Sequence, residues 1–151
     1  PIILGWAKPV PYDPTRLHKD LRYGPLKVAL AGPASNILIA LILGTIIRFG
    51  GTIFNSEVIA FFGFIVFLNV LLAVFNLIPV PPLDGSKIIA AFLPREAAMT
   101  YERIGFLGVF ILLFLLFFIG GLNLIYLASY FILEFLVGPS GLTPFLQLFG
   151  S

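Results

Sequence analysis

The chain has 151 residues, of which 60% are hydrophobic and only 11% are charged. Soluble domains usually carry about 25% charged residues and disordered chains are poor in hydrophobic ones, so both classes are excluded. Cys is absent, which excludes disulfides and thiolate zinc sites, and a net charge of +2 without a basic run argues against nucleic-acid binding. We predict one membrane-embedded domain over residues 1–151, an all-α polytopic bundle of three to four transmembrane helices.

The first 27 residues differ from the rest of the chain. They contain prolines at 9, 11, 14 and 25, which favour extended backbone. Trp6, Tyr12 and Tyr23 are typical of the boundary between a membrane and water. We therefore expect an extended interfacial stretch over 1–27.

Apolar runs predict the membrane helices, because a span needs about 20 mostly apolar residues. Two uncharged runs predict helices over about 28–48 and 57–78. A third run has thirty uncharged residues, from 104 to 133, interrupted by Gly120-Gly121. Paired glycines weaken a helix, so we predict two helices here, 104–119 and 122–137, with one long tilted helix as the alternative. The tail at 138–151 is expected to be a frayed end or an interfacial segment.

The basic residues predict the orientation. The first 27 residues hold five Lys or Arg and the connection at 79–103 holds three, whereas Arg48 alone borders the connection between the first two helices. Because two helices cross the membrane between them, residues 1–27 and 79–103 lie on the same side. The positive-inside rule assigns that side to the cytoplasm.

Two motifs interrupt the apolar helices. The first is Gly32-Pro-Ala-Ser-Asn36, where small residues allow another helix to approach closely. Asn36 brings an amide to membrane depth. The Asn36 amide either forms a structural hydrogen bond with a neighbouring helix, which is the commoner role, or takes part in the activity of the protein.

The second motif is Asn76-Leu-Ile-Pro-Val-Pro-Pro-Leu-Asp84-Gly85. Its prolines remove backbone donors and predict an extended path. An ionisable residue such as Asp84 beside a membrane segment is a functional-site hypothesis by default. On chemistry alone, Asp84 could instead pair with Lys87, or cap a helix running from about 86 to 93.

With these motifs the chain resembles the site-2 protease family of intramembrane zinc metalloproteases. The segment ending in Leu83-Asp84-Gly85 is similar to the one that supplies that family's third protein zinc ligand. Residues 32–36 are similar to its GPxxN motif, and residues 5–11 to the stretch that follows its HExxH helix. The three motifs stand in the family's order and cover most of residues 5–87.

One element of the family pattern is missing. No HExxH is present, and the single histidine, His18, lies in a polar stretch typical of a solvated surface. In the family's order the motif would precede Gly5. We therefore expect a fragment, the C-terminal part of a larger protease domain, with the histidine ligands upstream of Pro1 and with little activity of its own.

The resemblance implies a function for the complete protein. It implies a zinc metalloendopeptidase of a prokaryotic cell membrane that cleaves transmembrane substrates near the cytoplasmic face. Asp84 would bind Zn2+, while Asn36 and Asn76 would orient the substrate or stabilise the oxyanion. The alternatives are a non-proteolytic membrane protein, such as a transporter segment with Asp84 as its coupling carboxylate, and a catalytically dead relative of the proteases.

Overall fold

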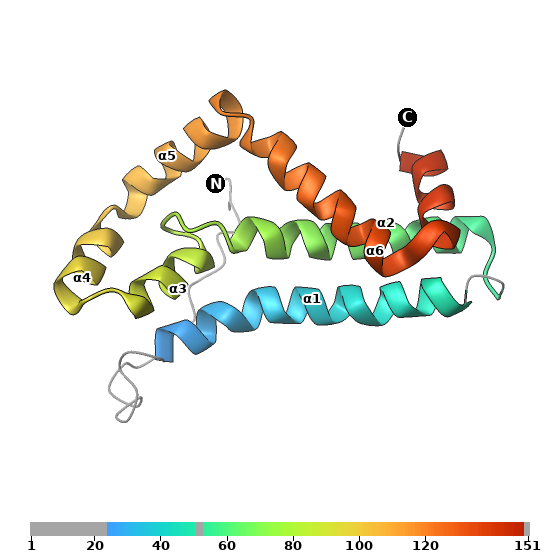
Figure 1. The fold of residues 1–151 in the computed structure, drawn as a ribbon, viewed down its shortest axis with the longest axis horizontal. Helices are drawn as coiled ribbons and strands as arrows, with labels where there is room; N and C mark the ends of the chain where they lie inside the picture. The colour runs from blue at the N-terminus through green and yellow to red at the C-terminus, as the bar shows by residue number, and fades with distance from the viewer. Residues whose placement is uncertain (1–23, 51–52, 150–151) are drawn as a thin grey trace, which may run out of the picture.

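A computed structural model describes residues 24–50 and 53–149 of the chain (Figure 1). The described part is helical, with the helices α1 (Gly24–Gly50), α2 (Ser56–Asn76), α3 (Asp84–Phe92), α4 (Arg95–Arg103), α5 (Gly105–Phe118) and α6 (Gly121–Phe149). Three of them, α1, α2 and α6, are long and apolar enough to cross a membrane, and the bent pair α4–α5 could make a fourth crossing. The all-α membrane fold with three to four spanning helices is therefore confirmed.

The three long helices form the bundle. In Figure 1, α1 and α2 run side by side, and α6 packs against both. Their shared core consists of side chains from all three helices: Ala40, Ile47, Ile59, Val66, Val70, Leu133, Val137 and Phe145. Many large apolar side chains still face outward, among them Phe49, Phe61 and Phe135. Such a surface suits lipid and not water, because an apolar surface of this size would drive association of the protein in water.

The bundle helices lie close to their predicted positions but differ at the ends. Helix α1 begins at Gly24, so the last residues of the expected extended stretch form its first turn, and Pro33 is accommodated within it. Residues 1–23, including His18 and the motif at 5–11, lie outside the described residues. Helix α2 is capped by Asn55, whose side chain accepts a hydrogen bond from the Val58 amide, a standard way to satisfy a free donor at a helix start.

The apolar run from 104 to 133 forms two helices that meet at the glycines, as predicted. Gly120 has a φ of 78°, a conformation that other residues rarely adopt, and it ends α5. At about 1.5 Å per residue, the 14 residues of α5 span about 21 Å, less than the roughly 30 Å hydrocarbon layer. Helix α5 alone is therefore too short to cross, and because it meets α4 at 72°, the pair forms either one broken span or a re-entrant loop.

The C-terminal tail is helical, which corrects the expectation of a frayed end, while the interfacial segment stays a prediction. Helix α6 breaks at Gly138, whose φ is 66°, and continues to Phe149. Pro139 has no N–H to donate to the carbonyl of Phe135 one turn earlier. Arg48, at the end of α1, donates to that carbonyl instead. Beyond the break, Phe145 is buried against the bundle.

Helices α3, α4 and α5 form an arm at the end of the bundle where α1 begins and α2 finishes (Figure 1). Helix α3 was predicted to run from about 86 to 93, two residues late at its start and one at its end, whereas α4 was not predicted. A second, smaller apolar cluster joins the arm to the bundle. Leu112 and Leu116 of α5 and Ile125 of α6 pack there with side chains of α2 and of the segment that follows it.

Candidate functional site

The candidate site lies where the arm meets α1. Helix α2 ends at Asn76, and a chain of turns over 77–83 leads directly into α3. Asp84 is the first residue of α3, with Leu83 as its N-cap. An acidic residue in the first turn is favoured there by the helix dipole. The alternative that the Asp84 side chain caps this helix is not supported, because Leu83 is the N-cap and no side-chain cap bond is formed.

The carboxylate of Asp84 faces the small-residue motif of α1. A Cβ added to Gly32 would lie 3.3 Å from Oδ2 of Asp84, so the absence of a side chain at Gly32 lets α3 bring its carboxylate onto α1. The small residues of this motif were predicted to admit another helix, and α1 and α3 are indeed packed together. The structure thus brings together two motifs that are about fifty residues apart in the sequence.

The surroundings of Asp84 make its ionised form less favourable than it is in water. Partial burial raises the pKa of the Asp84 carboxyl above its usual value, and the charge of Lys87 partly offsets this by lowering it. Lys87 does not form an ion pair with Asp84, because its Nζ lies 3.3 Å from Oε1 of Glu102 on α4. Within the described residues no hydrogen bond reaches the Asp84 carboxylate. Its oxygens are therefore available to a ligand.

The two asparagines lie near this point without touching it. Asn36 stands four residues after Gly32, on the same face of α1, and is half-buried. Asn76, also half-buried, is the last residue of α2. Across the described ranges, no hydrogen bond joins either amide to Asp84 or to a neighbouring helix. Their roles stay predictions.

The segment between α2 and α3 is not extended, which corrects the expectation of free backbone in this region. Of its residues 79–83, only Val80 and Leu83 keep an N–H. The Val80 amide donates to the carbonyl of Ile78 at 2.8 Å, and the Leu83 amide to that of Val80 at 2.9 Å. The prolines leave so few donors that tight turns satisfy all of them. A substrate strand therefore finds no free N–H in 79–83.

Three contacts missed by sequence analysis hold this turn segment in place. The hydroxyl of Tyr101 on α4 donates to the carbonyl of Pro79 at 2.6 Å. A Cβ at Gly108 of α5 would collide with the carbonyl of Pro81, and one at Gly85 with those of Leu77 and Ile78. Gly108, a small residue among large apolar ones, was a readable signal of close packing. Nothing in the sequence distinguishes Tyr101.

The described residues do not make a complete zinc site. A catalytic zinc usually takes three protein ligands and a water, and no group of three His, Cys, Asp or Glu side chains comes together in residues 24–50 and 53–149. Asp84 fits one such ligand: it is anionic, partly desolvated and free of other bonds. Any further ligands have to come from residues outside those described.

Comparison with known proteins agrees with the resemblance. Residues 44–119, half of the chain, match the sequence model of peptidase family M50. This chain belongs to peptidase family M50. The matched residues include Asn76 and Asp84, whereas Asn36 precedes them.

Individual relatives point the same way. The chain is 38% identical over 120 residues to Bacillus subtilis YwhC, covering 73% of the chain and 54% of YwhC. It is 41% identical over 66 residues to Methanocaldococcus jannaschii MJ0611, covering 42% of the chain and 32% of that protein. Mycobacterium tuberculosis Rip3 is 34% identical over 71 residues, covering 46% of the chain and 18% of Rip3.

All three relatives are named as candidate zinc metalloproteases. The chain spans about half the length of YwhC and less of the other two. No solved structure matches the chain.

Proposed function

We propose that the complete protein is an intramembrane zinc metalloendopeptidase that cleaves transmembrane substrates, with Asp84 as one protein ligand of the zinc. The observation that carries the proposal is the approach of the Asp84 carboxylate to Gly32, which unites two family-like motifs at one end of a membrane bundle. Membership of family M50 and the names of the relatives support it. The remaining ligands are two histidines of an HExxH helix upstream of Pro1.

The position of Asp84 suits such a ligand. A carboxylate beside lipid is unfavourable unless a cation neutralises it, and burial within the protein already raises the pKa of Asp84. The fixed turn segment and the first turn of α3 would hold the carboxylate in a constant position. When bound, zinc would polarise the scissile carbonyl and activate a water molecule.

Asn36 and Asn76 are proposed to orient the substrate or to donate to the oxyanion, since amide donors stabilise developing negative charge. Asn76 ends α2 directly before the turn segment, and Asn36 lies about one helical turn after Gly32 on α1. The turn segment has no free N–H over 79–83, so donors to an oxyanion have to come from other groups, and these two side-chain amides are candidates. Four of the five basic residues in the described ranges, Lys27, Lys87, Arg95 and Arg103, belong to this end of the bundle, which supports a site that faces the cytoplasm. The relatives in Bacillus subtilis and Methanocaldococcus jannaschii support a prokaryotic cell.

The test is the zinc content of the purified full-length protein, together with cleavage of a model transmembrane substrate. Native protein should hold about one zinc per chain. Asp84→Asn should lose most of the metal and all measurable cleavage, while it still inserts as a helical bundle. Glu96→Gln, a matched change of an exposed acid on α4, should alter neither. Full zinc and full cleavage in Asp84→Asn would refute the ligand assignment.

Two other outcomes would point to the alternatives. Zinc-free native protein without cleavage would favour a non-proteolytic role, with Asp84 as an ion-coupling carboxylate. A zinc-loaded native protein that cleaves no substrate would favour a catalytically dead relative. Sequencing upstream of Pro1 separates these cases independently, because the proposal requires an HExxH helix there.

A further inference from the structure

A cavity of about 480 Å³ lies beside the candidate site, between the start of α1 and helices α3 and α4. Its apolar lining includes Ala91, Leu93 and Met99, and its charged lining consists of Lys87, Arg95 and Glu102. Asp84 does not line it. The cavity is therefore separate from the proposed metal ligand, although α3 contributes to both.

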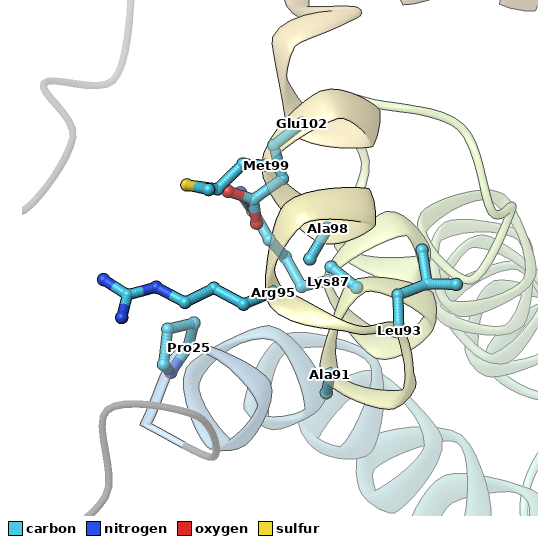
Figure 2. Close-up of a pocket in the computed structure, with 9 residues that line it drawn as sticks. Pro25, Lys87, Ala91, Leu93, Arg95, Ala98, Met99 and Glu102 are labelled. Carbon is cyan, nitrogen blue, oxygen red and sulfur yellow. Dashed lines mark hydrogen bonds and ion pairs between the residues drawn. The ribbon is translucent and has the colours of Figure 1, made fainter.

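The charges of the cavity are unevenly balanced. Lys87 and Glu102 form an ion pair at 3.3 Å, so their charges largely cancel. Arg95 contributes the remaining positive charge, and no ion pair to it is found within the described ranges. Figure 2 shows the Arg95 side chain extending from α4 toward Pro25, on the same side of the helix as Met99 and Glu102. A guanidinium presented in this way is suited to bidentate binding of a phosphate.

The location of the cavity and its combination of apolar and charged lining also suit a phospholipid. The cavity lies at the end of the bundle that carries four of the five basic residues in the described ranges, all except Arg48. Such an end suits the anionic headgroups of the cytoplasmic leaflet. A free phosphate would gain nothing from Leu93 and Met99, whereas a phospholipid places apolar chain next to its phosphate. Helix α4 has no buried residue, as expected for a helix lying at a membrane surface.

From this charge complementarity we infer that the cavity between α1, α3 and α4 binds an anionic phospholipid, whose phosphate lies on Arg95 and whose apolar part covers Leu93 and Met99. Lys87 is the second cation within reach of the phosphate if it exchanges Glu102 for the lipid. The inference does not depend on proteolysis, so it can succeed or fail independently of the proposed function.

The test measures the affinity of the purified full-length protein for fluorescent phosphatidylglycerol and phosphatidylcholine in mixed micelles. Phosphatidylglycerol should bind at least tenfold more tightly than phosphatidylcholine. Arg95→Gln should remove most of this preference. Arg103→Gln is the matched control, because it deletes the same charge from the same helix but does not line the cavity. The Arg103→Gln variant should keep the native preference for phosphatidylglycerol over phosphatidylcholine.

A second variant tests the cavity without removing a charge. Ala98 lines the cavity from α4, and Ala98→Phe should weaken phosphatidylglycerol binding several-fold by filling it. Equal binding of the two lipids would overturn the inference, as would equal losses in Arg95→Gln and Arg103→Gln, which would indicate diffuse surface attraction. Displacement of the lipid by millimolar inorganic phosphate or by an acidic peptide would assign the cavity to those ligands instead.

Discussion

The bundle and the arm both depend on glycine, but their glycines contact different neighbours. In the bundle, a Cβ at Gly44 would meet the side chain of Leu136 at 3.0 Å, and one at Gly63 the side chain of Phe145 at 3.4 Å. In the arm, Gly85 and Gly108 lie against backbone carbonyls of the turn segment. The contact at Gly63 requires no movement, whereas the backbone carbonyls of the turn segment are fixed by turns and cannot yield. Gly63 in the bundle should therefore tolerate a side chain that Gly85 in the arm does not.

The largest effect is expected for Gly85→Ala. The new methyl group would lie only 2.5 Å from the carbonyl oxygen of Ile78 and closer still to that of Leu77, so α3 has to move away from the turn segment. Overpacking of this kind costs about 1–3 kcal/mol. Because Asp84 is the preceding residue, we expect zinc content and cleavage by the full-length protein to fall by at least tenfold.

Gly63→Ala is the matched control in the bundle. Its Cβ would make ordinary van der Waals contact with Phe145, and alanine favours a helix by about 1 kcal/mol over glycine. Thermal unfolding and zinc content should stay at native values or rise slightly. If both variants lost zinc to the same extent, the proposed difference between the bundle and the arm would be wrong.

A smaller effect is expected for Tyr101→Phe, which removes only the hydroxyl that binds the Pro79 carbonyl. One such hydrogen bond contributes about 0.5–1.5 kcal/mol to stability. We expect zinc affinity to fall several-fold as the turn segment loosens. Tyr126→Phe, on α6 within the bundle, deletes a hydroxyl that makes no hydrogen bond within residues 24–50 and 53–149. It should leave zinc affinity unchanged, and equal losses in the two variants would contradict the assignment.

The same contrast explains what could be predicted from the sequence. The bundle helices were predictable because a membrane demands long uncharged runs, and the break at Gly120 because glycine weakens a helix. Asp84 and Gly32 were found as motifs, but their contact was not, since it depends on how α3 packs on α1. Helix α4 was missed because its nine mixed-polarity residues resemble a loop.

The prolines at 79, 81 and 82 gave a misleading signal. Proline favours extended backbone locally, and an extended strand was therefore expected. The observed turns depend on partners elsewhere in the chain, namely the hydroxyl of Tyr101 on α4 and the bare Cα of Gly108 on α5. Local preference was overridden by contacts that are twenty or more residues away in the sequence.

The smallest predicted effect concerns pH. The pKa of Asp84 is raised in the folded chain, mainly by burial, so the metal-free folded state binds more protons than the unfolded state in the interval just above the ordinary Asp pKa. Stability then falls as pH rises through that interval and is constant above the folded pKa. Metal-free protein should therefore unfold at a slightly higher temperature at the acidic end of the interval. Asp84→Asn should lose this component of the pH dependence, whereas Glu96→Gln should retain it.

Zinc reverses the sign of this pH dependence, because the bound cation requires the ionised carboxylate and protons compete with it. A native protein whose metal-free and zinc-loaded forms respond to pH in the same direction would show that Asp84 is not where the metal binds.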